Sequence, residues 1–249
     1  MANGLDDNLW IGCYRPNLTA SIRLFCFPHA GGAASSYRLW GENLPSSVEV
    51  FPIQYPGRQN RFREPPFTSI DDLVAELHVA LEPLLVPPFA FFGHSLGTLV
   101  AFELARRLRK TKRPAPKLLI LSGRAAPHVV SGESPVHVLP DDAFIREVTN
   151  RYNGVPRVVL EDAELLKLLL PTLRADIAMA ETYERREEPP LDCRMSVYGG
   201  LGDSVSREDL AAWEMHTSGA FSLRMLPGDH FFFESERDRL LPAIAADLF

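Results

Sequence analysis

The sequence has few cysteines, and none of them forms a recognisable pattern. Cys13, Cys26 and Cys193 are isolated, odd in number and without Cys-x-x-Cys spacing. This distribution argues against a cysteine-based zinc or redox site. It favours a reduced, cytoplasmic compartment.

Long apolar runs and export signals are also lacking. The longest apolar stretch, residues 84–92, is interrupted by Pro87-Pro88 and is far shorter than the roughly 20 residues that span a bilayer. The first seven residues carry acids where a secretory signal needs positive charge, and no apolar segment follows them. We therefore expect a protein that is neither exported nor inserted in a membrane.

The chain has no excess of positive charge. Its 26 lysines and arginines face 32 acids, and the resulting net charge of −6 repels phosphate backbones, which argues against nucleic-acid binding. The 249 residues are 46% hydrophobic, which is enough for a large core. The 21 prolines and 16 glycines are spread along the chain, which excludes collagen-like or low-complexity order.

Alternating strand-like and helix-like segments indicate an α/β protein. Short β-branched and aromatic runs recur between longer amphipathic stretches, which is typical of βαβ units around a mostly parallel sheet. Apolar residues at helical spacing predict crossover helices over 71–85 and 99–109. The predicted strands cover 22–27, 48–53, 89–92, 117–122, 194–198 and 222–226. We expect one mostly parallel central sheet flanked by helices.

One connection between predicted strands is much longer than the others. It has 71 residues, 123–193, where a helix and two short loops would suffice. It predicts helices over 139–148, 161–170 and 171–186, the last opened by Pro171. We interpret it as a helical lid over the carboxyl ends of the strands, inserted in a single domain, 1–249. An independent helical domain is the alternative.

A Gly-x-Ser-x-Gly pentapeptide joins the strand at 89–92 to a predicted helix. In Gly93-His94-Ser95-Leu96-Gly97 the glycines lack the Cβ atoms that would collide where strand and helix meet. Such a turn exposes the serine hydroxyl at a helix N-terminus, which stabilises developing negative charge. Ser95 is therefore the candidate nucleophile and the Leu96 N–H a candidate oxyanion donor. For His94 we expect packing or an orienting role.

The candidate acid and base lie after later strands, because this motif is followed along the chain by an acid and then a histidine. Asp203 ends a glycine-rich turn after the strand at 194–198, and His230 follows the last strand through a turn. We predict His230 as general base and Asp203 as the residue that orients it. An N-cap of the helix that begins near Ser206 is the alternative role of Asp203, and Asp229 is interpreted as a turn residue. The other histidines are expected at surface or packing positions: His29, His78, His128, His137 and His216.

A second oxyanion donor is expected from the loop after the first strand. Residues 28–32, Pro-His-Ala-Gly-Gly, are small enough for backbone to approach a ligand, and the Ala30 N–H is the candidate. The loop lacks the P-loop pattern and the Gly-x-Gly-x-x-Gly fingerprint, so it predicts neither a phosphate cradle nor a dinucleotide site. A plain turn is the alternative reading.

Together these motifs resemble the stand-alone type II thioesterases of nonribosomal peptide and polyketide biosynthesis. The resemblance covers nearly the whole chain and implies an α/β-hydrolase fold. It implies Ser95, Asp203 and His230 as the catalytic triad and the N–H groups of Ala30 and Leu96 as the oxyanion hole. Its segments are Phe-Pro-His-Ala-Gly-Gly at 27–32, Tyr-Pro-Gly-Arg at 55–58, Phe-Phe-Gly-His-Ser-Leu-Gly at 91–97, Ser-Gly-Arg at 122–124, Leu-Pro-Thr-Leu-Arg-Ala-Asp at 170–176, Glu-Thr-Tyr at 181–183 and Gly-Asp-His-Phe-Phe at 228–232.

The resemblance also implies a substrate and a partner. It implies hydrolysis of acyl groups from the phosphopantetheine arm of acyl or peptidyl carrier proteins, which clears stalled or aberrant units from an assembly line. It implies a monomer without metal or organic cofactor, and the net charge and the short apolar runs argue against nucleic-acid and membrane partners. An acyltransferase or product-releasing cyclase with the same triad, a general esterase and a non-catalytic carrier-binding module are the alternatives.

Two further features are hypotheses about how such a substrate binds. An acidic carrier protein needs a local basic surface, although cations that cap a solvated helix end are the alternative reading. The candidate docking runs are Arg106, Arg107, Arg109, Lys110, Lys112 and Arg113, and Arg58, Arg61 and Arg63. An acyl chamber under the lid would include some of an apolar set for which core packing is the alternative: Leu165, Leu166, Leu168, Leu169, Leu173, Ile177 and Met179.

Overall fold

A six-stranded sheet forms the centre of the molecule. The computed structural model describes residues 8–130, 132–152 and 157–249, and its strand order is β2-β1-β3-β4-β5-β6, with every neighbouring pair parallel. The strands are β1 (Ile22–Phe27), β2 (Val48–Pro52), β3 (Phe89–His94), β4 (Leu118–Ser122), β5 (Arg194–Gly200) and β6 (Phe221–Leu226). The predicted parallel sheet is confirmed, with strand ends that differ by one or two residues. The acidic start of the chain lies outside the described residues.

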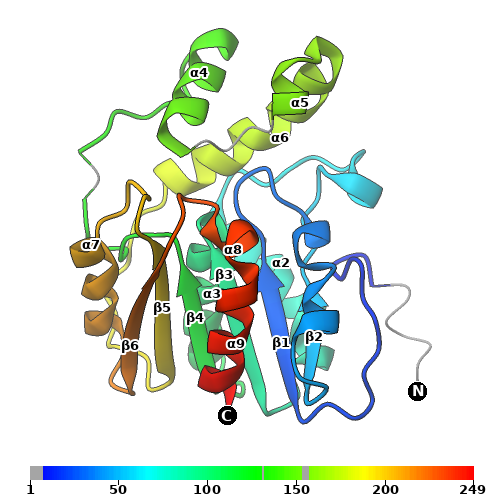
Figure 1. Cartoon of the computed structure of the whole chain (residues 1–249), viewed down its shortest axis with the longest axis vertical. Coiled ribbons are helices and arrows are strands. Elements are labelled where there is room, and N and C mark those ends of the chain that lie inside the picture. Colours follow the sequence, from blue (N-terminus) through cyan, green and yellow to red (C-terminus); the bar gives the residue numbers. More distant parts are fainter. Residues whose placement is uncertain (1–7, 131, 153–156) are drawn as a thin grey trace.

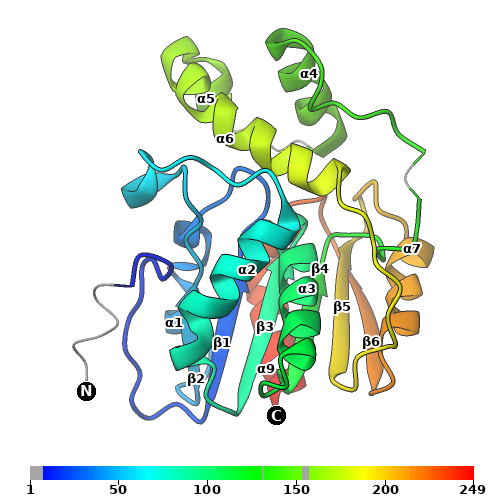
Figure 2. The same ribbon diagram turned by 180° about the vertical axis from the view of Figure 1, so that it is seen from behind.

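Helices cover both faces of the sheet (Figures 1 and 2). On one face lie α2 (Ile70–Leu81) and α3 (Leu96–Lys110), and on the other lie α1 (Trp40–Asn43) and α9 (Arg237–Leu248). The shorter elements are η1 (Ala34–Tyr37), η2 (Gln59–Arg61), η3 (Glu82–Leu84), α7 (Arg207–Ala211), η4 (Ala212–His216) and α8 (Phe232–Ser235). Among the residues that the structure describes, none of the helices combines the length and apolar character needed to cross a membrane.

The central strand β3 shows why its sequence is apolar without alternation. Phe89 and Phe91 pack in the core on the α2–α3 side, and Ala90 and Phe92 pack in the core on the α1–α9 side. All four side chains are almost fully buried. A strand covered on both faces needs apolar residues at every position, because successive side chains point to opposite faces.

Two predicted helices have different ends in the structure. The helix predicted over 71–85 ends as an α-helix at Leu81 and continues as η3, which contains Pro83 in its first turn. Proline has no N–H to continue the α-helical hydrogen bonds, so the tighter turn replaces them. The helix predicted over 99–109 begins earlier, at Leu96 directly after the candidate nucleophile, and ends at Lys110.

Three helices lie between β4 and β5, above the carboxyl ends of the strands (Figure 1). They are α4 (Asp141–Tyr152), α5 (Arg157–Leu160) and α6 (Ala163–Glu181). They have a small core of their own, made of Val136, Phe144, Val148, Val159, Leu173 and Ile177. This core meets the sheet domain at Ala30, in the loop after β1. The helices lie where the lid is expected, and their assignment to one domain with an inserted lid stays a prediction.

One prediction about helix α6 is wrong. Pro171 was expected to open a third lid helix, but α6 runs without interruption through it from Ala163 to Glu181. The true start is capped by Asp162, whose carboxylate accepts the N–H groups of Glu164 and Leu165, both at 3.0 Å. An internal proline removes one helical hydrogen bond, but packing of the helix face supplies most of its stability. Tertiary contacts therefore overrule the local preference of proline.

Candidate active site

Ser95 stands at a strained turn between β3 and α3. Its backbone has φ 53° and ψ −113°, and its side chain is partly exposed. A Cβ on Gly93 would lie 2.2 Å from the carbonyl oxygen of Gly97, and a Cβ on Gly97 would lie 2.0 Å from the carbonyl oxygen of Phe27. Only glycine fits at these two positions, so strand and helix can close on each other and leave the serine at the tip.

Thr98 holds this turn in place, and sequence reasoning missed it. Its hydroxyl oxygen lies 2.9 Å from the carbonyl oxygens of both Gly93 and Ser122, and it accepts the Ser122 N–H at 3.2 Å. The Ser122 carbonyl also accepts the Ser95 N–H at 2.8 Å. One buried hydroxyl therefore joins the ends of β3 and β4 around the candidate nucleophile. A hydroxyl residue three positions after the serine is a signal that could have identified it.

The close contact at Gly97 makes a testable prediction. Gly97→Ala should lower the free energy of unfolding by about 2–4 kcal/mol, because the new methyl group overlaps backbone that cannot move away without opening the turn. Activity of the folded fraction should fall as well. Chemical denaturation measures the change. Gly41→Ala is the matched control, since nothing lies within 4 Å of its added Cβ and alanine favours the helix. Equal stability of the two variants would contradict the prediction.

His230 and Asp203 are brought together at the carboxyl ends of β5 and β6. His230 Nδ1 lies 2.9 Å from Asp203 Oδ2 and 3.1 Å from Oδ1. The side chains are only 5% and 1% exposed, respectively. The contact is therefore shielded from water and fixes the ring orientation. The alternative role of Asp203 as an N-cap is wrong, because Ser206 caps α7 by accepting the Asp209 N–H at 3.1 Å.

A cluster of aromatic rings surrounds His230 on the side of the serine turn. The His94 ring centroid lies 5.1 Å from that of His230 and 4.2 Å from that of Phe233, and His94 Nδ1 lies 3.0 Å from Ser122 Oγ. His29 packs 5.2 Å from Phe231. Burial holds the pKa of His94 well below its usual value and lowers the pKa of His29 to about 3. Both rings are neutral at pH 7 and have packing roles, as expected for these histidines.

These buried histidines predict acid lability. Burial lowers the pKa of His29 to about 3 and that of His216 to about 4. In the unfolded chain both side chains bind a proton near pH 6.5, and in the folded chain they do not. Because the unfolded state binds more protons, stability falls as pH drops from about 6.5 towards 4. At pH 5 the loss is about 2 kcal/mol for each such histidine. Urea denaturation at pH 5 and 7.5 should show it. His216→Gln should have a smaller pH slope than the parent protein, and an identical slope would contradict the prediction.

The candidate oxyanion donors lie on two elements, the start of α3 and the loop after β1. Leu96 is the first residue of α3, where N–H groups have no acceptor within the helix. On the loop after β1, the two N–H groups that follow Ala30 are occupied. Gly31 N–H donates to Asp176 Oδ2 at 2.7 Å, and Gly32 N–H donates to the His29 carbonyl at 2.9 Å. Two hydrogen bonds therefore hold the backbone directly after Ala30.

The lid reaches the histidine. Tyr152, the last residue of α4, has its ring 5.3 Å from the His230 ring. Of the expected chamber residues, Leu173 and Ile177 are buried in the lid core and Met179 in the core on the α2–α3 side. Leu168 and Leu169 are 49% and 37% exposed, and a lining role for these two stays a prediction.

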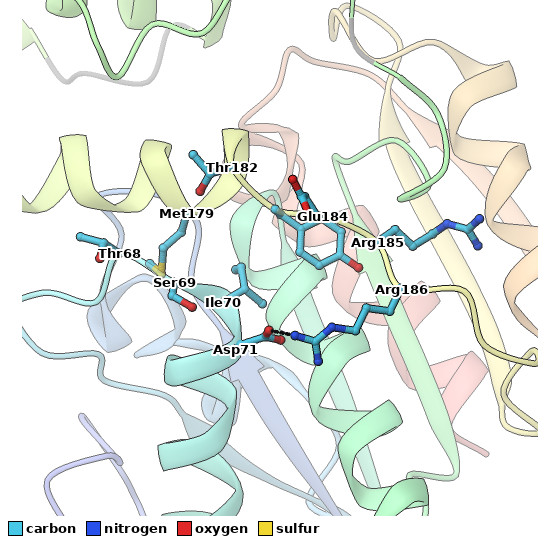
Figure 3. Close-up of a pocket in the computed structure, with 10 residues that line it drawn as sticks. Thr68, Ser69, Ile70, Asp71, Met179, Thr182, Glu184, Arg185 and Arg186 are labelled. Carbon is cyan, nitrogen blue, oxygen red and sulfur yellow. Dashed lines mark hydrogen bonds and ion pairs between the residues drawn. The ribbon is translucent and has the colours of Figure 1, made fainter.

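A polar cavity lies beside the lid but away from the candidate triad. Its volume is about 290 Å³, and it lies between the start of α2 and the end of α6 (Figure 3). It is bounded by Thr68, Ser69, Ile70, Asp71, Met179, Thr182, Tyr183, Glu184, Arg185 and Arg186. An ion pair between Asp71 and Arg186 crosses its edge. Since Ser95, Asp203 and His230 are not among the lining residues, we assign it no role in the chemistry.

Several cations of the two basic runs are buried or already paired. Arg58 and Arg61 are buried, at 5% and 6% exposure, so these two are wrong as docking residues, whereas Arg63 of the same run is exposed. In the other run, Glu188 pairs with Arg106, Arg109 and Lys110, at 2.8, 2.8 and 2.5 Å. This run also lies at the C-terminal end of α3. Since a helix rises 1.5 Å per residue, that end is about 20 Å from Ser95. Charge counted along the sequence does not show which cations are already neutralised.

The three cysteines differ in burial. Cys26 and Cys193 are buried and Cys13 is exposed, and all three are free thiols. Within the three described segments, no group of three or more histidine, cysteine, aspartate or glutamate residues could hold a metal ion. Burial raises the pKa of Cys193 to about 12, so this thiol is not an activated nucleophile.

Known proteins are similar to this chain in sequence and in fold. The model of the protein family described as "Thioesterase domain" matches residues 22–248. The gramicidin S biosynthesis protein GrsT of Aneurinibacillus migulanus is 41% identical over 94% of this chain and 91% of its own length. Thioesterase PikA5 of Streptomyces venezuelae is 42% identical over 93% and 83%. The solved structure of RedJ, a thioesterase from the prodiginine biosynthetic pathway of Streptomyces coelicolor, has a TM-score of 0.87 at 39% identity and covers 93% of this chain and 92% of its own.

Proposed function

The chain belongs to the thioesterase domain family, and from this premise we propose that it cleaves acyl thioesters through Ser95, His230 and Asp203. Family membership makes the protein a hydrolase of thioesters, and the α/β-hydrolase fold implied by the resemblance is confirmed. Solved structures similar to this chain include proteins named as type II thioesterases, BorB of the borrelidin biosynthetic cluster and YbtT of the yersiniabactin NRPS/PKS pathway, as the resemblance predicted. The observation that supports the named residues best is the shielded 2.9 Å contact of His230 with Asp203, beside the serine turn.

The proposed first half-reaction is acylation of the serine. Ser95 Oγ attacks the thioester carbonyl carbon while His230 Nε2 takes the hydroxyl proton. Asp203 holds the opposite ring nitrogen, so the imidazole keeps the tautomer that can accept the proton, and the imidazolium is stabilised. The C–S bond then breaks, the proton passes from His230 to the departing thiolate, and an acyl-serine ester remains.

The second half-reaction is hydrolysis of that ester. Water attacks the acyl carbon, gives its proton to His230 and releases the free acid, with the proton returning to Ser95 Oγ. In both halves a tetrahedral oxyanion forms, and the N–H groups of Ala30 and Leu96 donate to it. N–H groups that already point at the oxyanion stabilise its charge without rearrangement of the protein. The loss of one such donor typically lowers the rate by about 10²–10³-fold.

The proposed substrate is an acyl or peptidyl group on the phosphopantetheine arm of a carrier protein. It follows from the relatives, whose names place them in gramicidin S and prodiginine biosynthesis and among thioesterases. The role would be to remove stalled or aberrant acyl units so that an assembly line can resume. No metal or organic cofactor takes part in the proposed steps, and a cytoplasmic monomer is the expected state.

Product analysis on loaded carrier proteins tests this proposal. The protein is incubated with acetyl-, longer acyl- and aminoacyl-carrier proteins, and the products are identified by mass spectrometry. We expect free acid and regenerated phosphopantetheine thiol. Lactone, ester or transferred acyl product would instead assign a cyclase or an acyltransferase, which share this triad and differ in the nucleophile that reaches the acyl-serine.

A further inference from the structure

The lid helix α6 is attached directly to the loop that carries Ala30. Asp176, inside α6, accepts the Gly31 N–H at 2.7 Å. The neighbouring turn of the same helix packs Leu173 against Gly31, where an added Cβ would lie 3.1 Å from Leu173 Cδ1. Figure 1 shows α6 crossing above the sheet, in the position from which it can reach this loop. A helix of the lid is therefore part of the support of the oxyanion loop.

A buried arginine completes this attachment. Arg58 Nη1 and Nη2 donate to the two carboxylate oxygens of Asp176, both at 2.8 Å, and Nη1 also donates to the Gly32 carbonyl at 2.9 Å. Arg58 is 5% exposed and Asp176 is fully buried. Burying a charge pair is unfavourable unless its geometry is good and its remaining hydrogen-bonding groups are satisfied. Here the two-point contact and the bonds to Gly31 and Gly32 satisfy them.

The geometry of the loop transmits this support to Ala30. Arg58 and Asp176 hold the Gly32 carbonyl and the Gly31 N–H, and the Gly32 N–H in turn donates to the His29 carbonyl at 2.9 Å. The His29 carbonyl and the Ala30 N–H belong to one planar trans peptide, so they point in opposite directions. A peptide held at its oxygen therefore has its N–H direction set as well.

We propose that Asp176 and Arg58 are positioning residues that aim the Ala30 N–H at the oxyanion, so that the site is competent only while α6 is seated on the oxyanion loop. This inference rests on the proposed function, since it needs Ala30 as an oxyanion donor. It assigns to the lid a part in the chemical step besides covering the site. A misaimed donor loses transition-state stabilisation but leaves ground-state binding of the acyl chain in place.

Three variants test the proposal. Arg58→Lys keeps the positive charge but loses the two-point contact, and Asp176→Asn keeps an acceptor for the Gly31 N–H but breaks the ion pair. The double variant Arg58→Met/Asp176→Leu replaces the buried pair by apolar side chains of similar volume, a change that often preserves the fold. Asp247→Asn is the matched control, because Asp247 is a buried carboxylate on α9 that accepts from Arg224 at 2.6 Å.

The measurements are kcat and KM on an acyl N-acetylcysteamine thioester, the inhibition constant of a trifluoromethyl ketone analogue that forms a tetrahedral adduct, and thermal unfolding. We expect kcat to fall about 10- to 100-fold in the three variants with KM within about threefold, and inhibitor affinity to fall by the same factor as kcat/KM. Asp247→Asn should lose stability without a change of kcat beyond about twofold.

Two outcomes would overturn the inference. One is a folded double variant with kcat near that of the parent protein, and the other is a loss confined to KM. Failure of the proposed function is distinguishable, because then Ser95→Ala would keep its turnover. If Ser95→Ala is inactive while the double variant is fully active, the positioning role alone fails.

Discussion

Ser95→Ala is expected to lower kcat for thioester hydrolysis by at least about 10³-fold, while KM changes by less than about threefold. The alanine variant cannot form the acyl-enzyme, because the atom that attacks the carbonyl is missing. The fold should be unaffected, since the backbone at this turn is held by Thr98 and the two glycines and not by the serine hydroxyl. Residual activity would come from the oxyanion hole and substrate binding alone.

Steady-state rates with an acyl-carrier protein measure this effect, and intact-mass spectrometry of quenched reactions gives a second readout. The parent protein should carry a transient acyl adduct on the peptide that contains Ser95, and Ser95→Ala should carry none. Ser46→Ala, a change at an exposed serine, is the control and should behave like the parent protein. Undiminished turnover by Ser95→Ala would falsify the nucleophile assignment.

Asp203→Asn should also have a large effect, a decrease of kcat by about 10³–10⁴-fold with a nearly unchanged KM. The amide can offer its N–H₂ group to His230 Nδ1, which then stabilises the tautomer that has its proton on Nε2. That tautomer cannot accept the serine proton. The amide also fails to stabilise the imidazolium, and both losses act only on the chemical step.

The neighbouring acid provides the control for this prediction. Asp229 precedes His230 and accepts the Phe231 N–H at 2.9 Å, a bond that an asparagine can still accept. Asp229→Asn should therefore change kcat by less than about fivefold. A large effect at Asp229 and a small one at Asp203 would show that the wrong carboxylate has been assigned.

The parallel sheet and its order of strands and helices could be predicted from the sequence because most strands, though not the only partly buried edge strand β6, are buried on both faces. Such strands need unbroken apolar runs, and β3 and β4 stand out for that reason. Helix ends were less predictable. Pro83 changes the last turn of its helix, whereas Pro171 lies inside a continuous one, and local preference alone does not separate these two cases.

In the candidate site, too, one part follows from local sequence and another from the tertiary structure. Gly93, Ser95 and Gly97 form a local motif whose shape follows from backbone sterics, so the sequence alone indicated it. Asp203 and His230 were found from their places after late strands, because parallel strands bring their carboxyl ends to one edge of the sheet. Their contact at 2.9 Å is a result of the fold.

What the sequence by itself determined is the class of fold, the family and the residues that carry the candidate chemistry, because these depend on local patterns and on the order of elements. Only the tertiary structure decided which charged side chains are exposed and which are buried in ion pairs. Arg58 counted as a surface cation in the sequence, yet it is buried against Asp176, 118 residues later. Burial and pairing depend on contacts between distant segments, and no local pattern encodes them. For that reason, the link between α6 and the loop after β1 is visible only in the folded molecule.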